Sequence, residues 1–148
     1  MNIRVKDIMM PNPITVDLNQ TVFHLKEIML LHQPECLLVL DSKKALVGIL
    51  TPNNLATAAA VAPDEPIEDY MIKTFKKINA NATIQEAASL LLSQEVEALP
   101  VVDNNDRLIG VVNYKDIVKD LVDDFSQKLT PESAVIYLAM TKDPEQEE

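Results

Sequence analysis

The sequence repeats itself at an interval of 62 residues. The chain of 148 residues has only two glycines, Gly48 and Gly110, and they lie 62 positions apart. At this offset residues 5–58 align with residues 67–120 without a gap, and identical pairs include Asp7 with Asp69, Met9 with Met71, Thr21 with Thr83 and Asp41 with Asp103. Self-similarity at a fixed period of this length indicates a duplicated supersecondary unit. The chain is therefore expected to fold as two related halves.

Each repeat predicts the order strand, helix, strand, strand, helix. A short apolar run leads to a threonine, Thr21 or Thr83, that stands where a helix N-cap belongs, and an amphipathic pattern follows it. Two further apolar runs joined by a polar turn are typical of a hairpin. The second helix is expected to begin at Thr51 in the first repeat and at Asn113 in the second.

The fold class that follows is α/β (α+β), with two pseudo-symmetric β-α-β-β-α repeats and a C-terminal helical extension. One small sheet with two helices on one face leaves its other face bare, so we expect the two sheets to pack together. The expected boundaries are residues 1–62 for the first repeat, 63–124 for the second, and 125–148 for a C-terminal helix and an acidic tail.

The C-terminal helix is predicted from Thr130 onward, with Pro131 at its first position. Its pattern AVIYLAM is apolar on more than one side, which requires a covering surface. We expect it either to pack across a dimer or onto a partner, or to fold back on its own domain.

Charge and composition exclude several classes of function. A net charge of −10 argues against nucleic acid as a partner, because phosphates would be repelled. The single cysteine excludes an intrachain disulfide, and His24 and His32 lack the spacing of a metal pair, so no metal site is expected. No signal peptide or membrane span is recognisable, and we expect a cytoplasmic protein. No catalytic constellation can be argued from spacing, and no enzymatic activity or cofactor is expected.

The stretch ALPVVDNNDRLIGVVNYKDIV at 98–118, its duplicated partner and the leading VKDIM and IEDYM segments resemble the cystathionine beta-synthase (CBS) domain family, whose tandem pairs form Bateman modules. The resemblance covers roughly residues 5–120. It implies a regulatory module that binds adenosine-containing ligands in clefts between the repeats and often forms disc-like dimers.

The family's motif places a Ser or Thr three residues before an Asp that holds the ribose hydroxyls. Asp116 matches that aspartate, while Asn113 stands at the Ser/Thr position. In the first repeat Thr51 is present, but Asn54 replaces the aspartate. An amide can still hydrogen-bond a diol or an anion, without the charge that strengthens the bond.

The residues support the same chemistry without the family. The two oxygens of a carboxylate match the two donors of a ribose diol, which suits Asp116, although an Asp in a first helical turn also stabilises its own helix. Lysines gather in the second repeat at Lys76, Lys77 and Lys115. They favour a phosphate at a helix N-terminus, while the alternative for any single one is a solvated surface residue.

The candidate nucleotide site in the second repeat therefore combines a ribose ligand, phosphate ligands and an apolar wall, namely Lys76, Lys77, Ile78, Ala98, Leu99, Pro100, Asn113, Lys115 and Asp116. A second site in the first repeat, poorer or differently selective, would use Ile14, Thr15, Thr51 and Asn54.

The function expected from these patterns is the sensing of an adenine nucleotide by a homodimer that acts in trans on an unidentified target protein. AMP, ADP, ATP and S-adenosylmethionine present similar adenosine ends, and the sequence does not choose among them. A ligand-free dimerisation scaffold is the alternative. An enzymatic function would require ATP turnover that depends on an acidic residue such as Asp116.

Overall fold

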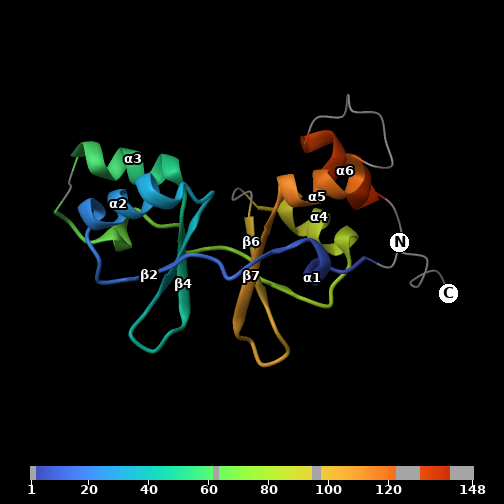
Figure 1. Cartoon of the computed structure of the whole chain (residues 1–148), viewed down its shortest axis with the longest axis horizontal. Coiled ribbons are helices and arrows are strands. Elements are labelled where there is room, and N and C mark those ends of the chain that lie inside the picture. The colour runs from blue at the N-terminus through green and yellow to red at the C-terminus, as the bar shows by residue number, and fades with distance from the viewer. Residues whose placement is uncertain (1–2, 62–63, 95–97, 123–130, 141–148) are drawn as a thin grey trace. The chain divides into compact units, whose positions relative to one another are not determined.

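The protein is described by a computed structural model, which covers residues 3–61, 64–94, 98–122 and 131–140. The chain divides into two compact units (Figure 1). The contiguous unit is Pro13–Phe75, and the split unit joins Met1–Asn12 to Lys76–Glu148. Both units contain a sheet with helices, as expected for an α/β fold built from two repeats. The packing of one sheet on the other stays a prediction.

The contiguous unit has a three-stranded sheet in the order β2-β3-β4. Strand β2 (Thr15–Asp17) is parallel to β3 (Leu37–Leu40), and β3 forms an antiparallel hairpin with β4 (Leu46–Leu50). Helix α2 (Val22–His32), helix α3 (Pro52–Val61) and the short 3₁₀ helix η1 (Ile67–Asp69) complete the unit. Its core is aliphatic and comprises Val16, Val22, Leu25, Leu37, Val39, Leu50, Leu55, Ala58 and Ile67.

The split unit has a four-stranded sheet in the order β1-β7-β6-β5. Strand β5 (Ile78–Asn79) is parallel to β6 (Ala98–Val102), which forms an antiparallel hairpin with β7 (Leu108–Asn113). The N-terminal strand β1 (Met10–Pro11) adds to the outer edge of β7. The helices are α1 (Val5–Ile8), α4 (Ile84–Leu92), α5 (Tyr114–Val122) and α6 (Pro131–Met140).

The threonine caps predicted from the repeat are confirmed. The Thr21 hydroxyl accepts a hydrogen bond from the backbone N–H of His24 at 3.4 Å, and the Thr83 hydroxyl accepts one from Glu86 at 3.1 Å. Each bond satisfies one of the amides that have no partner in the first turn of a helix. The order strand, helix, strand, strand, helix is confirmed in both repeats.

The two repeats exchange their leading segments. Residues 5–11 open the first repeat but belong to the split unit, where the amides of Val5 and Lys6 donate to the carbonyls of Ala82 and Ala80, each at 2.9 Å. The equivalent residues 67–73 belong to the contiguous unit, where Ile72 and Ile49 exchange two backbone hydrogen bonds at 2.8 and 3.0 Å. The compact units are thus offset from the repeat boundary expected between residues 62 and 63.

Helix α6 folds back on the split unit, where it packs against α4 and α5. Val135 and Leu138 are fully buried in the core of that unit, while Ile136 and Met140 on its other side are 41% and 80% exposed. For residues 131–140 this is the fold-back on the chain's own domain, the second of the two arrangements expected from the sequence. The predicted cap Thr130, the rest of residues 125–130 and the acidic tail 141–148 lie outside the described residues. In the described part of the chain no helix has the length and apolar character of a membrane span.

Candidate functional site

Asn113 and Asp116 form a reciprocal capping box at the start of α5. The backbone N–H of Asn113 donates to Asp116 Oδ2 at 2.9 Å, and the backbone N–H of Asp116 donates to Asn113 Oδ1 at 3.1 Å. Both side chains are partly buried. The structure therefore bears out the structural role of Asp116 and also fixes its carboxylate at the positive end of a helix dipole, where anions and polar ligands are bound.

Thr51 and Asn54 occupy the same positions at the start of α3. The backbone N–H of Asn54 donates to Thr51 Oγ1 at 3.2 Å, and the Thr51 hydroxyl donates to Asn54 Oδ1. Here the side chains bond to one another, whereas in α5 each side chain accepts from the backbone of the other residue. The amide of Asn54 supplies one neutral acceptor oxygen where Asp116 supplies a carboxylate.

The other candidate residues of the contiguous unit lie at the edge of β2. Ile14 is partly buried against the core, and its carbonyl accepts from the backbone of Leu38 at 3.2 Å. Thr15 is exposed at the first position of β2. These two residues and the Thr51–Asn54 pair thus belong to the same unit.

Gln94 connects the Lys76 segment to the sheet of the split unit. The backbone N–H of Lys76 donates to Gln94 Oε1 at 3.0 Å, and Gln94 Nε2 donates to the carbonyl of Ala98 at 2.8 Å. Ala98 in turn pairs with Asn113 in the hairpin. The backbone of Lys76 is therefore held at the end of the sheet where α5 begins, and its ammonium donates to Ser93 Oγ at 3.0 Å.

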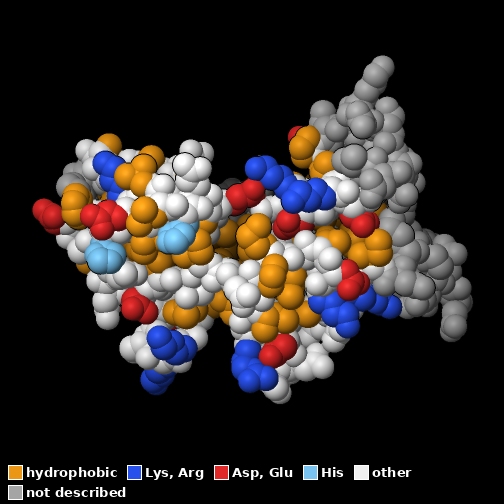
Figure 2. Space-filling view, in the orientation of Figure 1, with side chains coloured by type: hydrophobic (Ala, Val, Ile, Leu, Met, Phe, Trp, Pro, Cys, Tyr) orange, Lys and Arg blue, Asp and Glu red, His pale blue; other side chains and the backbone are white. Residues whose placement is uncertain are grey.

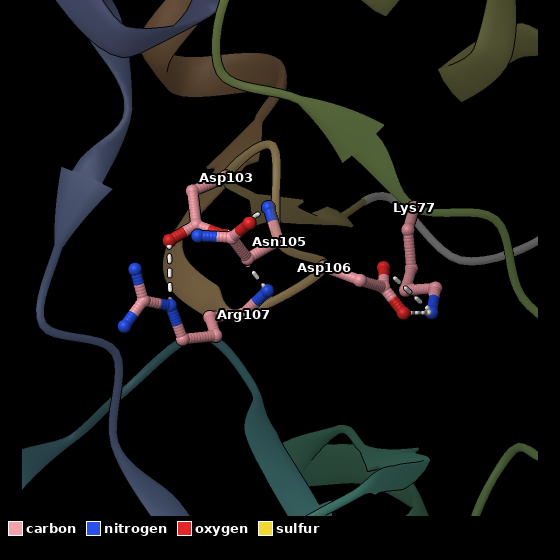
Figure 3. A network of polar contacts seen from close by, with 5 residues as sticks. All are labelled: Lys77, Asp103, Asn105, Asp106 and Arg107. Atoms are coloured by element: carbon pink, nitrogen blue, oxygen red, sulfur yellow. Dashed lines mark hydrogen bonds and ion pairs between the residues drawn. The ribbon is translucent and has the colours of Figure 1, made fainter.

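Lys77 lies with the polar network of the opposite hairpin end (Figure 3). Its ammonium pairs with both carboxylate oxygens of Asp106 at 3.3 Å. Asp103 closes the same turn, because its Oδ1 accepts from the amides of Asn105 and Arg107 at 2.8 and 3.0 Å. Of the three predicted phosphate lysines, only Lys115 lies within the first turn of α5 itself.

The expected apolar wall is mostly core. Ile78 and Leu99 belong to the hydrophobic core of the split unit and are 5% and 0% exposed. Ala98 is 5% exposed, and Pro100 is also buried. The side chains expected to form an apolar wall are therefore buried in the split unit.

Sequence reasoning did not single out Gln94. Its position follows α4 directly, and no pattern of charge or period marks it. An available signal was its place between α4 and β6, where a side-chain amide can satisfy backbone groups; in the structure these are the N–H of Lys76 and the carbonyl of Ala98.

Asp103 and Cys36, which lie outside the capping boxes, have shifted pKa values. Backbone hydrogen bonds from Arg107 and Asn105, with the guanidinium of Arg107 nearby, hold the pKa of Asp103 below its usual value. Burial, with a smaller effect of Glu35, raises the pKa of Cys36 to about 11. Within the described ranges, no three His, Cys, Asp or Glu side chains gather as a metal site would require.

Two β-α-β-β-α units with capped second helices define a tandem pair of small α/β modules. The family model for the CBS domain matches this chain twice, over residues 5–61 and 67–123. The chain therefore belongs to the CBS domain family, as the resemblance predicted.

Solved structures of CBS proteins share this fold. A conserved CBS domain protein of unknown function from Thermoplasma acidophilum is 29% identical, with a TM-score of 0.74 over 97% of this chain and 79% of that chain. The CBS domain pair of protein MJ0100, solved in complex with 5′-methylthioadenosine and S-adenosyl-L-methionine, is 26% identical, with a TM-score of 0.75 over 84% of this chain and 100% of that chain.

An enzyme carries a similar sequence as a minor part of its length. Inosine-5′-monophosphate dehydrogenase of Aquifex aeolicus is 31% identical over 113 residues, which are 75% of this chain but 23% of the enzyme. The chain thus spans about a quarter of this relative, and the remainder of the enzyme lies outside the match.

Proposed function

We propose that this chain is a regulatory module that binds an adenosine-containing ligand and acts on a partner protein in trans. The observation that carries the proposal is the adenosine chemistry of the related CBS pair, which was solved with 5′-methylthioadenosine and S-adenosyl-L-methionine. The relative among dehydrogenases supports a regulatory role, because there the matched region is a separate part of an enzyme.

The preferred binding site is the α5 end of the split unit. Asp116 accepts the ribose hydroxyls, and Asn113 and Lys115 contact phosphate at the helix N-terminus. Gln94 holds the backbone of Lys76 at the same end of the sheet, and the ammonium group of Lys76 adds positive charge to the site. Lys77 would join it only by leaving Asp106, which holds it at the other end of the hairpin.

The second site is the α3 end of the contiguous unit, and we propose that it binds more weakly. Thr51 keeps a hydroxyl for phosphate, whereas Asn54 lacks the charge that would strengthen bonds to a ribose diol. Ile14 and Thr15 carry no positive charge at the positions where the other repeat has Lys76 and Lys77. Two unequal sites would allow related nucleotides to compete.

Calorimetric titration of the chain, stripped of copurified ligand, with AMP, ADP, ATP and S-adenosylmethionine tests the proposal. The informative variant is Asp116→Asn, because its amide oxygen can still cap α5 while the charge is lost. We expect at least tenfold weaker binding with an unchanged circular dichroism spectrum. Asn54→Asp introduces the corresponding carboxylate in the first repeat and should strengthen binding at the weaker site.

Lys115→Ala separates the ligand classes. If the lysine contacts phosphate, the variant loses affinity for AMP, ADP and ATP but keeps its affinity for S-adenosylmethionine, which has no phosphate. Equal losses for all four ligands would remove the phosphate role of Lys115. If the wild-type chain turned over ATP and Asp116→Asn abolished that activity, the function would be enzymatic and not sensing.

A ligand-free scaffold is the second candidate. It is favoured by the capping box, which already employs Asp116, and by the internal partners of Lys76 and Lys77. Absence of heat from every nucleotide with a folded chain would establish it in place of the sensor. The homodimer and the cytoplasmic location belong to both candidates and stay predictions.

A further inference from the structure

The backbone of Lys76 is not fixed to its sheet in the way that its repeat equivalent is. In the contiguous unit the backbone N–H of Leu38 donates to the carbonyl of Ile14 at 3.2 Å and so fixes the residue before β2. At the offset of 62 residues these two positions are Pro100 and Lys76. Proline has no backbone N–H to donate, so this ladder bond cannot form in the split unit. Strand β5 has two residues where β2 has three.

The side chain of Gln94 takes the place of the missing ladder bond. Its Oε1 accepts from the backbone N–H of Lys76, and its Nε2 donates to the carbonyl of Ala98. One amide group thus joins two backbone segments by using both its acceptor and its donor. Because Ala98 is the register partner of Asn113, Gln94 holds Lys76 at the end of the sheet where α5 begins.

The ammonium group of Lys76 has a separate partner. It donates to Ser93 Oγ at 3.0 Å, and the Ser93 hydroxyl donates to the carbonyl of Leu90 at 2.8 Å in the last turn of α4. A cation is stabilised at the C-terminal end of a helix. Lys76 and Ser93 are both exposed, so water competes for this bond and its net contribution is small. The backbone of Lys76 is therefore fixed, while its ammonium group can exchange Ser93 for a ligand phosphate.

The first repeat lacks the residues for this arrangement. At the offset of 62 residues Gln94 corresponds to His32 and Lys76 to Ile14. His32 is exposed at the end of α2, and Figure 2 shows the two histidines of the chain at the surface among hydrophobic side chains. Of the two candidate sites, the one at the α5 end thus has both the tethering amide and the lysine that it holds.

We propose that Gln94 makes the site at the α5 end selective for adenosine ligands that carry a phosphate, because it holds Lys76 where that phosphate binds. The inference rests on the proposed function and names the ligand class of that site. Gln94 is a positioning residue, since it acts through Lys76.

The selectivity follows from the charge on the 5′ substituent of the ligand. S-adenosylmethionine carries a sulfonium cation on its 5′ carbon, where a nucleotide carries its first phosphate. A lysine held at this point attracts the phosphate and repels the sulfonium. The site at the α3 end, with Ile14 in place of the lysine, does not make this distinction.

Calorimetric titration of the full chain with ATP and with S-adenosylmethionine tests this role in the wild type, Gln94→Ala, Lys76→Met and the double variant. We expect each single variant to bind ATP about tenfold more weakly, as for the loss of one hydrogen bond to a charged group, and to keep its affinity for S-adenosylmethionine. In the Lys76→Met background, Gln94→Ala should have no further effect, because Gln94 acts through the lysine. His32→Ala, at the equivalent position of the first repeat, is the matched control and should bind both ligands as the wild type does.

Hydrogen exchange at the Lys76 amide, followed by NMR, measures the tether without any ligand. Exchange should be slow in the wild type and in His32→Ala, and at least tenfold faster in Gln94→Ala. An equal exchange rate in the wild type and Gln94→Ala would overturn the assignment.

Two results of the titrations would overturn the positioning role while the sensor function stands. One is an equal loss of affinity for ATP and S-adenosylmethionine in Gln94→Ala, which would indicate general damage to the site. The other is a further loss of ATP affinity when Gln94→Ala is added to Lys76→Met. A wild-type chain that binds neither ligand would overturn the proposed function as well, and a protected Lys76 amide would then show a tether with a structural role alone.

Discussion

Gly110 faces the thioether of Met9, although the two residues are far apart in sequence. A Cβ atom at position 110 would lie 2.5 Å from Met9 Sδ and 2.9 Å from the carbonyl oxygen of Met10. Gly48 faces Met71 in the same way. A Cβ atom at position 48 would meet Met71 Sδ and would lie 2.8 Å from Met71 Cγ. Neither glycine has a positive φ angle. The two glycines are therefore required for close approach, which lets each sheet receive the leading segment of the other repeat.

Gly110→Ala should lower the free energy of unfolding by about 1–3 kcal/mol, the usual range for overpacking. Gly48→Ala should cost less, because the atoms that its methyl group meets are in the flexible side chain of Met71, whereas Gly110→Ala also meets the backbone of Met10. Urea denaturation of the two variants measures the difference.

A double-mutant cycle tests the assigned contact. Combining Gly48→Ala with Met71→Ala removes the clash, so the double variant should be more stable than the sum of the single changes predicts. Additive effects on the free energy of unfolding would show that the side chain of Met71 is not what excludes a side chain at position 48.

Leu138→Ala should destabilise the split unit by about 2–5 kcal/mol, since the side chain is fully buried in the core. Met140→Ala, in the same helix but 80% exposed, should change stability by less than about 0.5 kcal/mol. Thermal unfolding followed by circular dichroism gives both values. Equal effects at the two positions would contradict the packing of α6 on α4 and α5.

Asp103 should make the stability of the hairpin turn depend on pH. Its pKa in the folded chain is lowered, first by the backbone hydrogen bond from Arg107. The stabilisation is therefore complete above the pKa of the unfolded chain and is lost as the pH falls through the folded pKa. The difference in melting temperature between wild type and Asp103→Asn should narrow on acidification from pH 6. A difference that stays constant down to pH 2 would be evidence against this role.

Cys36 should react slowly with thiol reagents. With a pKa of about 11, only about 0.1% of the thiol is ionised at pH 8, and the side chain is buried. Reaction with a maleimide should be complete within minutes in urea and much slower in the folded chain. Fast labelling of the folded chain would mean that the segment just before β3 opens readily.

The secondary structure could be predicted because its signals are local. Thr21 and Thr83 mark helix starts by their side-chain chemistry, and the hairpins follow from short apolar runs around polar turns. The exchange of the leading segments could not be predicted. Residues 5–11 and 67–73 are equivalent in sequence, so each fits either sheet, and no residue within them indicates which sheet it joins.

The candidate site could likewise be predicted from the sequence only where its signals are local. The capping relationship of Asn113 and Asp116 follows from a spacing of three residues at a helix start. The partners of the lysines do not follow from spacing, because Ser93 and Asp106 reach Lys76 and Lys77 from distant positions in the chain. The sequence therefore shows which charged residues the second repeat carries, but it does not show which way each side chain turns.

The exchanged segments impose an order on events during translation. The contiguous unit can close once its last residue, Phe75, has left the ribosome. Strand β1 cannot reach its place at that point, because Met10 pairs with Val111, which emerges about 100 residues later. At the usual rate of synthesis this is a wait of roughly 5–20 s, during which the residues of β1 have no strand to join. Strand β1 is thus made well before the strand that it joins.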